Sequence, residues 1–82
     1  MNALILSGKL TAAPSFVRLP NGVEKCEFEI ITNAPRGTME LHCCAYGKQA
    51  AKLDGLAEGE SVLVTGKLTG PGFAVVTSME RL

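Results

Sequence analysis

The chain has 82 residues, with eight basic and eight acidic side chains, so its formal net charge is zero and a strongly basic nucleic-acid binder is disfavoured. Hydrophobic residues make up 46% of it, yet no apolar run approaches the roughly 20 residues that a membrane span needs. The length predicts one domain over residues 1–82, and a domain this small and apolar is expected to form a homo-oligomer. The start lacks the basic leader of a signal peptide, which predicts a cytoplasmic protein.

The first half of the chain reads as strands joined by a tight turn. Residues 2–10 alternate between apolar and polar positions and predict a strand, in which Gly8 indicates a bend or a close backbone approach. Residues 15–19 continue as extended chain. The turn signal Pro20-Asn21-Gly22 then joins them to a second strand over residues 23–32, which together form a hairpin.

The second strand has one apolar and one charged side. Cys26, Phe28 and Ile30 fall on the first, whereas Lys25 and the neighbouring glutamates fall on the second. We therefore expect Phe28 to fill the core and the charged side to look outward.

The second half adds a helix and two more strands. Residues 33–37 predict a loop and residues 38–46 a third strand. Residues 47–59 carry apolar side chains at helical spacing between glycines, which predicts a short helix of about two turns or slightly more. The fourth strand is predicted over residues 60–69, which contain another internal glycine. A Gly-Pro-Gly turn then leads to the fifth predicted strand over residues 73–82.

This order of elements predicts an all-β fold. Five strands, with glycines inside the first and fourth where a small closed sheet must bend, indicate a barrel. A five-stranded barrel with one short helix between strands 3 and 4 is the OB-fold.

Four segments resemble the bacterial single-stranded DNA-binding protein family. They are NALILSGKLTAAP, PNGVEKCEFEI, AYGKQA and EGESVLVTGKL, and together they cover most of the chain in the family's order. The Cys-x-Phe of the second segment is especially similar to primosomal replication protein N, a short relative. The resemblance implies base stacking and phosphate neutralisation on single-stranded DNA by homodimers or homotetramers, in replication, restart or recombination, with replication or primosome proteins as further partners.

The sequence departs from the family pattern in several places. It contains no Trp, and Glu40 occupies the position of the family's third-strand Trp. The hairpin between strands 4 and 5 is short. The family's acidic-hydrophobic tail has no counterpart in these 82 residues, either because the sequence is a shortened form or because this member never had one, and on this count the short primosomal relative is the better match. Stacking must therefore fall on the few remaining aromatic side chains.

Tyr46 is the leading stacking candidate, because it matches the family's aromatic before Gly-Lys. A rim tyrosine with a bonded hydroxyl is the alternative. Phe16 and Phe73 are further candidates, although each could instead pack against the barrel.

Lys9 and Lys67 each follow a bend glycine, so we expect them to lie near each other. The full predicted nucleic-acid set is Lys9, Phe16, Arg18, Lys25, Arg36, Tyr46, Lys48, Lys67 and Phe73, with an ordinary solvated charge mixture as the alternative for its basic members.

Apolar residues on the outer faces of the predicted strands indicate an oligomer interface. The first strand, with Ile5, is expected to pair or pack across a two-fold axis. His42 resembles a family position near a subunit contact. The predicted interface set is Ile5, Ile31, Leu41, His42 and Leu63.

The sequence offers poor material for catalysis. One histidine without a paired carboxylate is unsuited to acid–base chemistry, and Cys43 and Cys44 point to opposite sides of one strand, so they cannot share a metal. We expect no enzyme activity, cofactor or metal. Two alternatives to single-stranded DNA remain: RNA on the same surface, and a protein-interaction module of a primosome or replication assembly with weak or no DNA binding.

Overall fold

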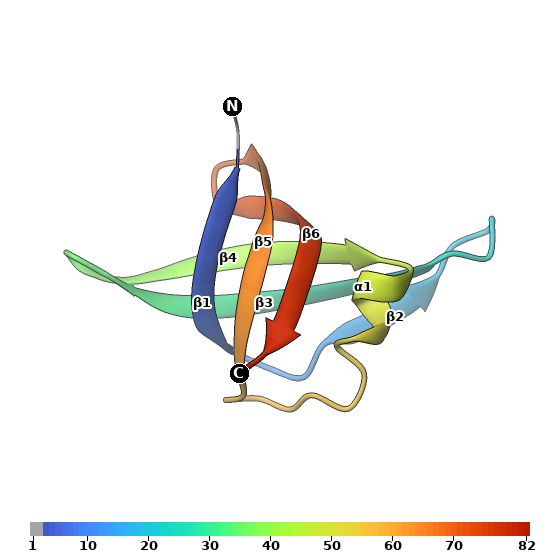
Figure 1. Ribbon diagram of the computed structural model, residues 1–82, viewed down its shortest axis with the longest axis horizontal. Helices are drawn as coiled ribbons and strands as arrows, with labels where there is room; N and C mark the ends of the chain where they lie inside the picture. The colour runs from blue at the N-terminus through green and yellow to red at the C-terminus, as the bar shows by residue number, and fades with distance from the viewer. Residues whose placement is uncertain (1–2) are drawn as a thin grey trace.

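The computed structural model describes residues 3–82 as a closed barrel with one appended strand and one short helix (Figure 1). The elements are β1 (Leu4–Leu10), β2 (Ser15–Arg18), β3 (Glu24–Ala34), β4 (Gly37–Tyr46), α1 (Lys48–Ala51), β5 (Ser61–Gly70) and β6 (Phe73–Arg81). The sheet order is β1-β5-β6-β4-β3-β2, and an additional β1–β3 pairing closes five of these strands into a barrel. The predicted OB-fold is confirmed.

Two glycines allow the barrel to close at its tightest points. A Cβ atom at Gly8 would lie 2.7 Å from the carbonyl oxygen of Ile31, where β1 meets β3. A Cβ atom at Gly66 would lie 2.3 Å from the carbonyl oxygen of Val75, at a register shift between β5 and β6. The close backbone approach predicted for Gly8 is confirmed, and Gly66 performs the same function in β5.

The core lies inside the barrel and under the helix. Alternate residues of the five barrel strands point inward, and Phe28 is 6% exposed among them, as predicted from its strand. Leu53 and Leu56 are buried just beyond α1, so the helical segment covers one end of the barrel. Burial of this aliphatic set supplies the main stabilisation of so small a fold.

The helix is shorter than predicted. It ends at Ala51 after four residues, and the chain continues in turns. The amides of Leu53 and Leu56 bond to carbonyls three residues back, and Gly55 has a φ of 81°, which an α-helix does not accommodate. The apolar spacing therefore indicated burial correctly but not the backbone conformation. Within the described residues, no helix has the length and apolar character needed to cross a membrane.

The predicted loop over residues 33–37 is mostly strand. β3 runs to Ala34 and β4 begins at Gly37, so only Pro35 and Arg36 form the turn. The two strands extend beyond the barrel as a long ribbon, which projects to the left in Figure 1.

Leu41 is a core residue, contrary to the prediction that it lies on an oligomer interface. It is 2% exposed and points into the barrel with Cys43 and Ala45. The reason is register, because Leu41 pairs with the inward-facing Ile30 across β3 and β4, and directly paired residues share a face. Because side chains alternate along β4, the phase that exposes His42 and Tyr46 places Leu41 inside the barrel.

Candidate nucleic-acid interface

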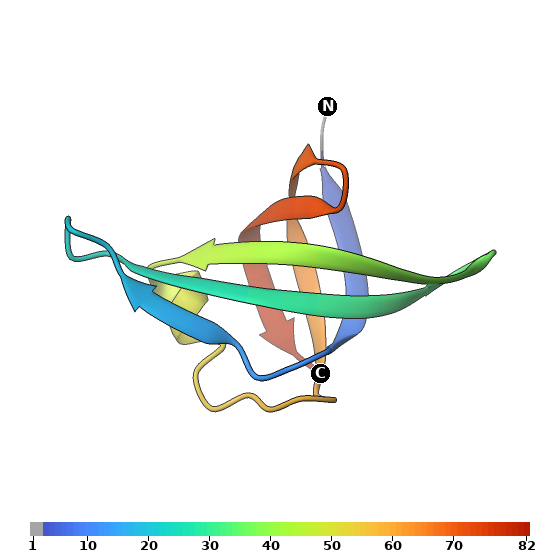
Figure 2. The ribbon, with the colours of Figure 1, turned by 180° about the vertical axis from the view of Figure 1, so that it is seen from behind.

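The outward side chains of β3, β4 and β6 form one continuous surface, called the outer face below. Three cross-strand pairs define it: His42 with Phe73, Cys44 with Val75, and Tyr46 with Lys25. Tyr46 is 40% exposed and Phe73 is 54% exposed. Figure 2 shows β4 lying between β3 and the upper part of β6 on this side of the molecule. Two exposed aromatic residues from distant parts of the sequence thus share one surface.

His42 is held in place on the outer face by two contacts, one of them to a carboxylate, contrary to the prediction that it has no paired carboxylate. Its Nε2 atom lies 2.8 Å from Oε2 of Glu29, and its ring stacks on that of Phe73 with centroids 5.4 Å apart and an interplanar angle of 19°. The hydroxyl of Thr11 donates to the other oxygen of Glu29, at 3.1 Å. Both oxygens of Glu29 are therefore engaged, and the His42 ring and the Phe73 ring form a fixed pair. The subunit contact expected for His42 stays a prediction.

Two lysines flank the aromatic residues. The Lys25 ammonium lies 3.0 Å from Oε1 of Glu27, and this hydrogen bond, with smaller contributions from Cys44 and Tyr46, raises the pKa of Lys25 above its usual value. Lys67 is exposed on β5 and pairs with Val75, which places it at the opposite border of the outer face. The surface thus combines ring faces with two cationic borders, the combination that single-strand binding requires.

A small recess lies beside the His42–Phe73 pair, between β4 and β6. Its volume is about 150 Å³. It is lined by Glu27, His42, Cys43, Cys44, Thr69, Phe73, Ala74 and Val75. No pattern in the sequence indicates this recess, because the parallel pairing of β4 with β6 brings together segments that are some 30 residues apart.

Lys48 and Arg36 lie at opposite ends of this surface. Lys48 begins α1 just after Tyr46, so it extends the basic border of the outer face near that residue. Arg36 lies in the turn of the projecting ribbon, beyond the barrel. Of these two residues, only Lys48 therefore lies next to an exposed ring of the outer face, that of Tyr46.

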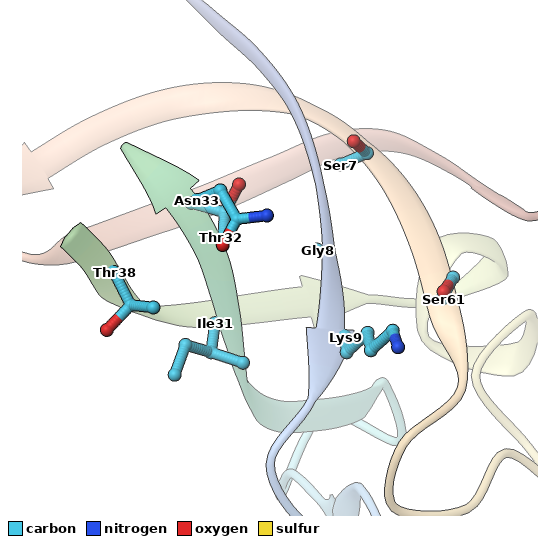
Figure 3. Close-up of a pocket in the computed structure, with 8 residues that line it drawn as sticks. All are labelled: Ser7, Gly8, Lys9, Ile31, Thr32, Asn33, Thr38 and Ser61. Carbon is cyan, nitrogen blue, oxygen red and sulfur yellow. The ribbon is translucent and has the colours of Figure 1, made fainter. Parts of the chain in front are cut away.

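Lys9 lies in a separate cleft of about 480 Å³ beside β1 (Figure 3). Among the described residues that line it, Lys9 alone is charged. Lys9 pairs with Ser61, whereas Lys67 lies six residues further along β5, about 20 Å away along the strand at roughly 3.3 Å per residue. The prediction that these two lysines lie near each other is wrong, because the two bend glycines occupy opposite ends of the β1–β5 pairing.

The described geometry agrees with the comparisons to known proteins. A model of the single-strand binding protein family matches residues 1–77. The chain belongs to this family. Two solved structures of the single-stranded DNA-binding protein from Thermus aquaticus, a deletion mutant and the wild type, are each 27% identical to it, with TM-scores of 0.89 and 0.88. They match all of this chain, which spans 41% and 40% of theirs.

A search of curated proteins found no match. The finer likeness to primosomal replication protein N stays a prediction. Glu40, at the position of the family's third-strand aromatic by the resemblance above, is exposed on the outer side of β4.

Phe16 and Arg18 face away from this surface. Phe16 pairs with Cys26, whose side chain points inward, so both residues lie on the opposite side of β3 from Lys25 and Tyr46. The guanidinium of Arg18 donates to the carbonyl oxygen of Gly22 at 3.2 Å and so stabilises its own hairpin. Phe16 and Arg18 therefore lie apart from Tyr46 and Phe73.

The cysteines divide between core and surface. Desolvation is the main cause that raises the pKa of Cys26 to about 11 and that of Cys43 to about 12, so both remain thiols at neutral pH. Cys44 is half-buried on the outer face, on the side opposite Cys43, as predicted. Among the described residues, no group of three or more His, Cys, Asp or Glu side chains is arranged to hold a metal ion.

Proposed function

We propose that this chain binds single-stranded DNA on its outer face, by stacking bases on Tyr46 and Phe73 and by neutralising phosphates with Lys25, Lys48 and Lys67. The observation that carries the proposal is the pairing of exposed rings with cationic borders on one surface, in a chain that belongs to the single-strand binding protein family. The Thermus aquaticus structures of similar fold are those of single-stranded DNA-binding proteins. Stacking and charge neutralisation accept many sequences, so binding is broad and involves no chemistry.

The other basic candidates have supporting roles at most in this proposal. Lys9 and Arg36 lie away from the exposed rings of Tyr46 and Phe73. They could contact phosphates of a DNA strand that continues past these rings. Phe16 and Arg18 contribute little, because they face the other side of the sheet. The protein acts in the cytoplasm, in replication, restart or recombination.

Fluorescence anisotropy with a labelled 30-nucleotide oligo-dT tests the proposal at low and high salt. We expect affinity to fall steeply as salt rises, and the Lys67→Ala variant to lower the slope of log K against log salt by about 0.7, because one fewer counterion is released. Lys52→Ala is the matched control, since the Lys52 ammonium is held by the carbonyl oxygen of Met79. A folded protein that binds no oligonucleotide at low salt would refute the proposal and favour the interaction module, and equal binding of oligo-rU would extend it to RNA.

We infer that the chain also associates with itself through β1. This strand pairs with β5 along Leu4–Lys9 but with β3 only at Lys9 and Leu10, so within the described residues most of its second edge has no partner strand. Ile5 is 71% exposed, and the partly buried Ile31 and Leu63 lie on the same outer side of the barrel. An unpaired edge with exposed apolar residues favours pairing with another copy.

Sedimentation equilibrium should show that the wild type forms dimers or tetramers and that the Ile5→Glu variant dissociates. A wild type that is monomeric at micromolar concentration would contradict self-association through β1.

A further inference from the structure

Carboxylates on a surface that binds a polyanion call for a physical explanation. Glu29 is engaged at both oxygens, by His42 and by the Thr11 hydroxyl. Glu27 is different: Lys25 occupies its Oε1, while its Oε2 has no hydrogen-bond partner among the described residues. The Glu27 side chain is 61% exposed and lines the recess beside the His42–Phe73 pair. A free carboxylate oxygen there repels phosphate but accepts a hydrogen bond from an amino group.

The recess has the size of one six-membered ring. Its volume is about 150 Å³. An engineered protein cavity of about 150 Å³ binds benzene, which has the ring size of a pyrimidine, whereas a purine carries a second fused ring. The stacked rings of His42 and Phe73 form one wall, with Cys44 and Val75 beside them. Aromatic rings thus line one part of the recess, and Glu27 adds a hydrogen-bond acceptor to it.

We propose that the recess is a subsite for one cytosine, which stacks against the His42–Phe73 pair and donates its exocyclic amino group to Glu27. The proposal deepens the function proposed above and rests on it. Acceptance of the cytosine amino group by a glutamate is a known mode of base recognition. Uracil and thymine present a carbonyl oxygen at the same ring position, so the carboxylate repels them. Lys25 is the positioning residue, because its ion pair directs Glu27 along the sheet surface.

The test compares 30-nucleotide oligo-dC with oligo-dU by anisotropy at pH 8 and one fixed salt concentration. The two polymers carry the same phosphates and differ only in their bases, at C4 and in the protonation of N3, so their affinity ratio isolates base recognition. We expect the wild type to bind oligo-dC at least about fivefold more tightly, which corresponds to the lower limit of discrimination by a good base contact. Glu27→Gln should bring the ratio close to one, because an amide both donates and accepts.

Glu40→Gln is the matched control, since it removes the same charge from the outer side of β4 but lies outside the recess. It should leave the ratio unchanged while both affinities rise slightly. Val75→Phe provides an independent variant that fills the recess, and it should also abolish the preference. Equal binding of the two polymers by the wild type, or a ratio that persists in Glu27→Gln, would overturn the subsite while leaving general strand binding intact. Failure of the wild type to bind any oligonucleotide would refute both proposals.

Discussion

Replacing Gly66 with alanine is expected to lower the free energy of unfolding by about 3 kcal/mol, the upper end of the usual cost of overpacking. The added Cβ would lie 2.3 Å from the carbonyl oxygen of Val75, and backbone cannot move aside as a flexible side chain can. The clash falls where β5 and β6 change register, so relief would require the barrel to open between them. Urea unfolding followed by circular dichroism measures the change.

Gly70→Ala is the matched control in the same strand. The nearest atom to its Cβ would be Cδ2 of Phe73 at 4.0 Å, which is an ordinary contact, so this variant should unfold within about 0.5 kcal/mol of the wild type. Equal losses in the two variants would show that the cost comes from strand propensity rather than from the close approach of the two strands.

Replacing Tyr46 with alanine is expected to weaken binding of 30-nucleotide oligo-dT by roughly 5- to 150-fold, because one stacked base contributes about 1–3 kcal/mol. The slope of affinity against salt should stay as in the wild type, since no phosphate contact is removed. Anisotropy titrations at several salt concentrations provide both quantities. This separates Tyr46 from Lys67, whose replacement should change the slope.

Two variants make the result for Tyr46 specific. Tyr46→Phe keeps the ring and should bind nearly as the wild type does, whereas a large loss would show that the hydroxyl matters. Phe16→Ala removes an aromatic residue of similar exposure from the other side of the sheet and should have little effect. A loss from Phe16→Ala as large as that from Tyr46→Ala would place the bound strand on the wrong face.

The sequence supported the barrel because each strand carries its own alternation. Phe28 and Cys26 are separated by one residue, so any strand containing them buries both on one side, whatever its neighbours are. Gly8 likewise marked a close approach before its partner was known. The same local reasoning failed where phase or backbone had to be inferred: Leu41 was assigned to the wrong face, and the segment after α1 uses tight turns in place of a second helical turn.

The candidate site shows the same division between local and distant information. Tyr46 could be singled out from its neighbours Gly47 and Lys48, which carry the family's pattern. The separation of Lys9 from Lys67 could not be predicted from neighbouring residues, and neither could that of Phe16 from Tyr46. Each depends on which residues face each other across strands. The ion pair of His42 with Glu29 also requires the β3–β4 register.

By itself, the sequence determined the type of fold, the identity of most core residues and the family, since these depend on alternation, glycine positions and motifs that lie within single segments. Only the tertiary structure decided which aromatic and basic residues share a surface and that a ring-sized recess lies beside the His42–Phe73 pair. The physical reason is that β4 and β6 pair in parallel across a long connection. Their register is set by closure of the barrel and burial of its core, and not by any local signal in either strand.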